Sequence, residues 1–177
     1  STLLRMMAGI YAPDKGSLKV RGRVSLLAGL GAGFQRNFTG RENISLTASI
    51  YGFDRKSIRE IEEEIIEFSG IRQFIDDPMR TYSAGMRARL GFAIISNLNP
   101  DVLLMDEVMS VGDHEFRKKS RARIEELVKS EATVVIVSHS KAILKSLCDK
   151  VYYIRQGQII NDGDFESAFE LYETVAA

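Results

Sequence analysis

The chain has 177 residues, of which 45% are hydrophobic and 27% are charged, as is ordinary for one globular domain with its own core. Its 24 basic and 24 acidic residues cancel, so net charge gives no argument for a nucleic-acid-binding protein. The apolar runs are far shorter than the roughly 18–20 residues that a membrane-spanning helix needs. The single cysteine, Cys148, excludes an internal disulfide and is interpreted as a small core residue.

The N-terminal part of the chain is expected to contain short elements separated by turn signals. They are a helix, a turn, two strands and a glycine-rich loop, in this order: 1–10, 13–16, Ser17–Val20, Arg23–Leu27 and 29–40.

The next part of the sequence is predicted to be helical from about residue 41 to 98. Helices are expected at Arg41–Tyr51, from a cap at Ser57 onward, and at Ser83–Asn97 before Pro100. Isoleucines follow helical spacing after Ser57, and a run of glutamates occupies mostly other faces, which indicates a solvated surface rather than a metal site.

The rest of the chain alternates strands and helices. Strands are expected at Val102–Met105 and Thr133–Val137, and their uninterrupted apolar pattern predicts burial on both faces, as in a parallel sheet. Helices are expected at Glu115–Lys129, Lys141–Leu147 and Asp164–Glu173, and a hairpin around Gln156-Gly157. This order predicts an α/β fold with the helical stretch 41–98 inserted between sheet strands.

Two segments carry the pattern of a phosphate-handling site. Ser83-Ala84-Gly85 opens a helix, and a helix N-terminus favours bound anions. Asp106-Glu107 ends the apolar strand, where a Mg²⁺ ion and an attacking water can be held. A turn with helix-capping carboxylates is the structural alternative for this acidic pair.

The first two residues, Ser1-Thr2, match only the end of the phosphate-loop pattern Gly-x-x-x-x-Gly-Lys-[Ser/Thr]. No complete copy of this pattern occurs later in the sequence. We therefore expect the chain to begin inside its own phosphate loop, with the glycines and the lysine before residue 1, and the chain alone to be inactive. A helix cap is the structural alternative for Ser1.

The order of these motifs resembles the nucleotide-binding domain of ABC transporters. Tyr82–Met86 resembles the Leu-Ser-Gly-Gly-Gln motif, 102–107 the Walker B strand, 110–113 the D-loop and His139 the switch histidine. The resemblance implies a P-loop NTPase (ABC ATPase) fold in a single domain, 1–177, with its first strand missing and a helical subdomain at about 41–98. The variant Tyr-Ser-Ala-Gly-Met and the segment Thr39–Asn43 resemble the subfamily that exports polysaccharides, O-antigen and teichoic acids.

The resemblance also implies a role for each candidate residue. ATP and Mg²⁺ would be bound through Ser1, Thr2 and Asp106, and Gln35 would link Mg²⁺ to the membrane partner. Leu30 is an alternative to Gln35, because counting back from Thr39 without gaps places Leu30 at the position of the family's Q-loop glutamine.

Catalysis would fall to Glu107, which polarises the attacking water, and to His139, which contacts the γ-phosphate. A core histidine is the alternative for His139. Ser83 and Gly85 would bind ATP held by a second subunit, and Asp113 would reach toward the partner's phosphate loop.

The implied protein is an ATPase that drives polymer export. It would act as a homodimer beneath integral membrane permease subunits, peripheral on the cytoplasmic face of the membrane, without nucleic acid. Alternatives are a soluble ABC ATPase in DNA repair or translation and a non-catalytic interaction fragment. The basic cluster at 117–123 is interpreted as a solvated helix face rather than a nucleic-acid or lipid site.

Overall fold

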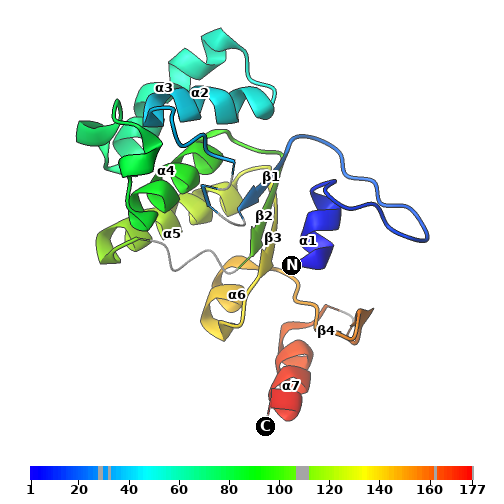
Figure 1. Cartoon of the computed structure of the whole chain (residues 1–177). Coiled ribbons are helices and arrows are strands. Elements are labelled where there is room, and N and C mark those ends of the chain that lie inside the picture. The colour runs from blue at the N-terminus through cyan, green and yellow to red at the C-terminus, as the bar shows by residue number, and fades with distance from the viewer. Residues whose placement is uncertain (28–29, 32, 107–111, 162, 177) are drawn as a thin grey trace. The chain divides into compact units, whose positions relative to one another are not determined.

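The computed structural model describes residues 1–27, 30–31, 33–106, 112–161 and 163–176 (Figure 1). The chain divides into two compact units, Ser1–Val135 and Ile136–Ala177.

The first unit contains a sheet with the strand order β1-β2-β3. The strands are β1 (Val24–Leu27), β2 (Val102–Asp106) and β3 (Thr133–Val137), of which β3 continues into the second unit. β1 and β2 are parallel, with Val24 opposite Val102 and Leu27 opposite Met105. The side chains of Leu103, Leu104 and Met105 are buried. The parallel sheet expected from the apolar pattern is therefore confirmed.

Two expectations about strands are wrong. Residues 17–20 form no strand, and Leu18 and Val20 are exposed, because no neighbouring strand pairs with them among the described residues. β3 is not buried: Thr133 is exposed and Val134 and Val135 are half-buried. The reason is that β3 ends the strand order, so a described strand flanks it on one side only.

Helices of the first unit lie on both sides of this sheet in Figure 1, with α1 opposite α4 and α5. Their bounds are α1 (Thr2–Met7), α2 (Gly40–Ile50), α3 (Arg55–Ser69), α4 (Ala84–Asn97) and α5 (His114–Lys129). Two 3₁₀ turns, η1 (Arg72–Phe74) and η2 (Met79–Thr81), connect α3 to α4.

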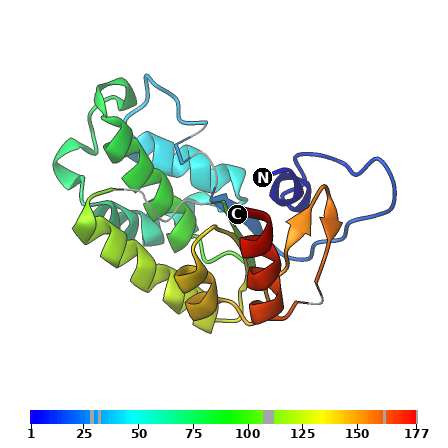
Figure 2. The same cartoon turned by 90° about the horizontal axis from the view of Figure 1, so that it is seen from below.

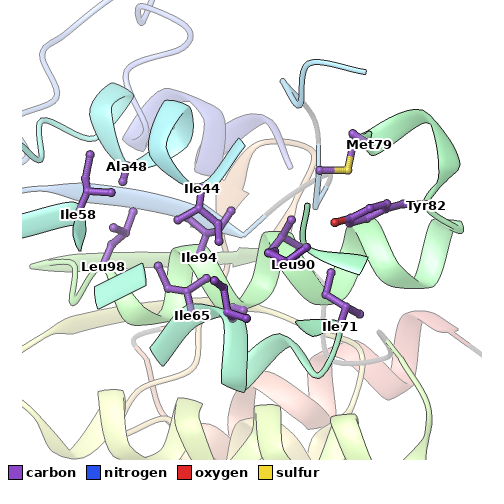
Figure 3. Packing of buried hydrophobic residues seen from close by; sticks show 13 residues of the cluster. Ile44, Ala48, Ile58, Ile65, Ile71, Met79, Tyr82, Leu90, Ile94 and Leu98 are labelled. Carbon is purple, nitrogen blue, oxygen red and sulfur yellow. The ribbon is translucent and has the colours of Figure 1, made fainter. Parts of the chain in front are cut away.

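A single hydrophobic cluster joins α2, α3 and α4 (Figure 3). It contains Leu90, Ala93, Ile94 and Leu98, while Met86 is only partly buried against it. Every member of the cluster lies between Ile44 and Leu98. Assignment of about 41–98 to an inserted subdomain stays a prediction, and the shared core is the feature that supports it.

Side-chain caps set the starts of these helices. Thr39 caps α2 in a capping box with Glu42. The cap of α3 is Asp54 rather than the predicted Ser57, whose backbone N–H donates to Asp54 Oδ1 at 2.8 Å. The prediction was wrong because both residues favour helix starts and the earlier one accepts the bond.

The acidic and basic helix faces are partly ion-paired. On α3, Glu62 lies 2.6 Å from Arg41, and Glu63 lies 2.9 Å from Arg72. On α5, two residues of the predicted solvated cluster bind other helices: Lys119 donates to the Glu67 carbonyl at 3.4 Å, and the guanidinium of Arg123 donates to the Ser96 carbonyl at 3.1 Å. Arg123 therefore binds the C-terminal end of α4 rather than facing solvent.

The second unit holds the end of β3, α6 (Lys141–Leu147), β4 (Ile154–Arg155), β5 (Gln158–Ile159) and α7 (Phe165–Ala176). Figure 2 shows β4 and β5 as an orange hairpin. Gln156 and Gly157 both have positive φ, 49° and 78°, as the predicted tight turn requires. Cys148 is half-buried, and burial raises the pKa of its thiol. Within the described part of the chain, no helix has the length and apolarity needed to cross a membrane.

Candidate functional site

Ser1 and Asp106 meet at the end of β2. The Ser1 hydroxyl donates to Asp106 Oδ2 at 2.5 Å. Ser1 precedes α1 but makes no side-chain cap bond, so its hydroxyl serves the carboxylate rather than the helix. A hydroxyl and a carboxylate oxygen thus converge on one point, and these are ligand types that Mg²⁺ accepts. Thr2 is exposed in the first turn of α1.

Glu107, the predicted catalytic acid, lies outside the described residues. Its neighbour Asp106 closes β2, whose pairing with β1 fixes where the strand ends. Asp106 therefore ends a buried parallel strand, and the position and role of Glu107 stay predictions.

Ser83 caps α4, and its Oγ accepts a hydrogen bond from the Met86 N–H at 3.1 Å. Ser83, Ala84 and Gly85 are all exposed. Among the described residues, no hydrogen bond or ion pair joins Ser83 or Gly85 to Ser1 or Asp106. The start of α4 therefore presents backbone N–H groups and a hydroxyl to solvent, which is an arrangement able to accept an anion.

Gly85 and Gly91 of α4 differ in whether the surrounding structure has room for a side chain. A Cβ built on Gly91 would lie 2.8 Å from the backbone nitrogen of Gly31, so packing against the glycine-rich loop excludes a side chain there. A Cβ on Gly85 would meet nothing closer than Ser83 Oγ, at 3.8 Å. Packing within the described chain therefore does not explain a glycine at position 85.

Gln35 is exposed, and the backbone around it is held by Asn43, a fully buried residue of α2. The Gln35 N–H donates to Asn43 Oδ1 at 2.7 Å, and Asn43 Nδ2 donates to the carbonyls of Gln35 and Thr39 at 3.1 and 2.8 Å. Asn43 thus fixes the chain that presents the Gln35 side chain. No described hydrogen bond joins Gln35 to Ser1 or Asp106.

Asp113 caps α5 and forms an ion pair with Arg89 of α4. The Phe116 N–H donates to Asp113 Oδ1 at 2.9 Å. This bond first, and then the Arg89 charge, lowers the pKa of the Asp113 carboxyl. Arg89 also lies over the Phe116 ring, 5.2 Å from its centroid. The ion pair links the helix that Ser83 caps to the predicted D-loop residue within one subunit.

His139 belongs to the second unit, where it is exposed and lies two residues after the end of β3. Its Nδ1 lies 2.9 Å from the hydroxyl of Tyr172 on α7. The two rings are tilted by 35°, with centroids 5.9 Å apart. His139 is therefore at the carboxyl end of a strand, as predicted, and it is not a buried core histidine.

The sequence interpretation gave no role to Asn43, Arg89 or Tyr172. Asn43 ends the segment Thr39–Asn43, and its position one turn after the helix cap Thr39 indicates from the sequence that its side chain can bond the backbone before the helix. Arg89 and Tyr172 act through contacts distant in sequence, with Asp113 and His139. Nothing local to their segments indicates those partners.

Together, the parallel strands, the acidic strand end and the exposed helix start define a nucleotide-binding α/β domain of the P-loop NTPase class. A solved structure described as "Structure of ATP binding subunit of ABC transporter" has a TM-score of 0.83 to this chain. The match covers 99% of this chain and 78% of that one at 15% identity, which shows the fold.

Sequence comparison gives the family. Residues 1–110 match the family described as ABC transporter. The O-antigen export system ATP-binding protein RfbB of Klebsiella pneumoniae is 43% identical over 177 residues, covering 100% of this chain and 72% of that protein. RfbB of Myxococcus xanthus is 40% identical over 184 residues, and the match covers 100% of this chain and 42% of that protein. The teichoic acids export ATP-binding protein TagH of Shouchella clausii (strain KSM-K16) is 38% identical, and the match covers 98% of this chain and 48% of that protein. The chain belongs to the ABC transporter family.

Proposed function

We propose that this chain is the ATP-binding and ATP-hydrolysing motor of a transporter that exports a cell-surface polysaccharide or a teichoic-acid-type polymer. The observation that carries the proposal is the 43% identity to an O-antigen export ATP-binding protein over the whole chain. Relatives named for teichoic acid export support the same substrate class at 38–39% identity. The partner of such a motor is an integral membrane permease.

Mg²⁺ fits the oxygens that meet at the end of β2. Ser1 and Asp106 would hold the ion, directly or through its water shell, and Gln35 would approach it from the loop that Asn43 fixes. When bound, Mg²⁺ supplies charge neutralisation on the phosphates. Glu107 would orient and deprotonate the attacking water, and Thr2 would bind a phosphate oxygen.

The remaining residues act at a homodimer interface in this proposal. Ser83 and Gly85 would bind the γ-phosphate of ATP held by a second copy, and their exposure and open space support this role. Asp113 would reach toward the phosphate loop of that copy, although it is paired with Arg89 here. His139 would stabilise charge that develops on the γ-phosphate. The motor would work at the cytoplasmic face of the membrane.

The experiment that tests this function is a Glu107→Gln substitution in the full-length gene product. Loss of the carboxylate removes the positioned base and leaves the phosphate contacts, so we expect ATP binding to persist and turnover to fall by about 100-fold or more. In its own host, the variant should leave the polymer inside the cell, as a gene deletion would. Glu64→Gln, an exposed glutamate of α3, is the matched control and should hydrolyse ATP normally. Normal turnover by Glu107→Gln would refute the assigned role, and normal polymer display in the deletion strain would refute the assigned substrate class.

A further inference from the structure

His139 has a hydrogen-bond partner that the proposed ATPase function leaves unexplained. Tyr172 is near the end of α7, and its hydroxyl lies 2.9 Å from His139 Nδ1. Both residues belong to the second unit, in which they line one small cavity of about 70 Å³.

The Tyr172 ring is held from two sides. Tyr153 and Phe169 pack edge-on against it, with interplanar angles of 76° and 78°. Phe169 is 6% exposed, so this side of α7 is anchored in the core of the unit. A ring held in this way can place its hydroxyl at a fixed position.

Ion pairs attach α7 to α6, the helix that begins two residues after His139. Lys145 lies 3.4 Å from Glu166, and Lys141 lies 3.8 Å from Glu173. The Lys141 ammonium also lies over the Phe169 ring, at 5.1 Å from its centroid. The distance from α7 to the segment that carries His139 is thereby constrained by several contacts.

The direction of the hydrogen bond between Tyr172 and His139 follows from counting the donors and acceptors of each side chain. A neutral imidazole has one N–H donor and one acceptor nitrogen, and a phosphate oxygen only accepts. For His139 to donate to a phosphate from Nε2, its Nδ1 must be the acceptor. A tyrosine hydroxyl can donate to that nitrogen, whereas a carbonyl at the same place would require the opposite tautomer.

We propose that Tyr172 is a positioning residue for His139: its hydroxyl donates to Nδ1, keeps the proton on Nε2 and fixes the orientation of the imidazole toward the γ-phosphate. This inference rests on the proposed function, because it assigns a purpose to the switch histidine. It assigns to α7 a part in hydrolysis through His139, without contact of its own with ATP.

The test compares Tyr172→Phe with the matched control Tyr153→Phe. Each substitution removes one hydroxyl from neighbouring rings of the same cluster and keeps the apolar packing. The first readout is the ¹⁵N spectrum of the His139 side chain in the 177-residue chain without nucleotide. We expect Nδ1 to be unprotonated and hydrogen-bonded in the wild type and in Tyr153→Phe. In Tyr172→Phe its resonance should move toward that of an unprotonated nitrogen without a hydrogen bond.

The second readout is ATP hydrolysis by the full-length gene product. A misoriented imidazole weakens transition-state contacts more than ground-state binding, so kcat should fall about five- to tenfold in Tyr172→Phe with little change in KM. Tyr153→Phe should keep the wild-type kcat. A merely structural role for Tyr172 would leave both the Nδ1 resonance and kcat at their wild-type values.

Two outcomes overturn the inference: a protonated Nδ1 in the wild type, or an Nδ1 resonance that is unchanged in Tyr172→Phe. His139→Ala separates the inference from the function beneath it. Wild-type hydrolysis by His139→Ala would refute the role of the histidine itself, whereas the spectrum of the resting chain would still report whether Tyr172 holds it.

Discussion

The two ends of α4 differ in burial and in what their residues contact. From Leu90 to Leu98 the helix is buried, and its side chains fill a common core with α2 and α3 (Figure 3). From Ser83 to Gly85 it is exposed, and no neighbour in the described chain explains the glycine. Packing within the subunit explains the buried end, whereas it does not explain the glycine at the exposed end.

The buried end gives the largest expected effect on stability. Leu90 is completely buried in the shared core. Leu90→Ala should lower the free energy of unfolding by about 2–5 kcal/mol, because it removes apolar contacts and leaves a cavity. Chemical denaturation followed by circular dichroism measures the change. Ile50→Ala, at a residue that is 73% exposed, is the control and should cost little. An equal loss in both variants would refute the assignment of the core to this face of α4.

The two glycines of α4 sharpen the comparison within one helix. Gly91→Ala should destabilise the chain by about 1–3 kcal/mol, because the added Cβ would contact the loop backbone at 2.8 Å. Gly85→Ala should be neutral or stabilising by up to about 1 kcal/mol, since alanine favours a helix and meets open space. Thermal unfolding of the two variants side by side measures the difference. A larger loss for Gly85→Ala would mean that packing, not a ligand, requires that glycine.

The smallest expected effect is at Tyr82, the buried residue that directly precedes the cap of α4. Its buried hydroxyl donates to the Phe74 carbonyl at 2.6 Å. Tyr82→Phe should therefore cost about 1 kcal/mol near neutral pH. Met79, equally buried in the same cluster, offers Met79→Leu as a volume-conserving control that keeps this bond.

Tyr82 also gives a pH dependence with a defined sign. Burial, with a smaller contribution from Asp77, raises the pKa of Tyr82 to about 12. An unfolded tyrosine ionises near a pKa of about 10. The contribution of Tyr82 to the free energy of unfolding is therefore fully present below about pH 10 and is lost between about pH 10 and 12. The reason is that the tyrosine of the unfolded chain releases its proton at a lower pH than that of the folded chain. Unfolding measured from pH 8 to 12 should show this loss in the wild type and less of it in Tyr82→Phe. Identical pH profiles would contradict the burial of an un-ionised hydroxyl at this position.

The sequence predicts those parts of the fold that local patterns specify. The predicted strands Val102–Met105 and Thr133–Val137, the hairpin at Gln156-Gly157 and the helix at Ser83–Asn97 all follow from hydrophobic pattern and turn chemistry. The supposed strand at 17–20 and the burial of β3 were wrong, because strand formation and burial depend on partners that a local pattern does not reveal.

The candidate site divides in the same way. Ser1 and Asp106 were predicted from motif order, and the structure brings their oxygens together. Asn43, Arg89 and Tyr172, which contact Gln35, Asp113 and His139, were not predicted, because each acts by a hydrogen bond or an ion pair that depends on the packing of helices. Motifs name the residues that would touch the ligand, whereas the structure names those that hold them in place.

The central claim is that the exposed start of α4 serves ATP bound to a second copy of the chain. The most direct measurement is the ATP-dependent mass of the full-length Glu107→Gln variant with and without Gly85→Asp, by light scattering. We predict an ATP-bound dimer for Glu107→Gln alone. The double variant should remain a monomer with near-normal ATP affinity, because the added carboxylate repels the γ-phosphate. Its unfolding free energy should be unchanged, since the site is open and an acidic residue suits the first turn of a helix. A double variant that still dimerises, or that loses ATP affinity as severely as an Asp106→Asn variant, would contradict the claim.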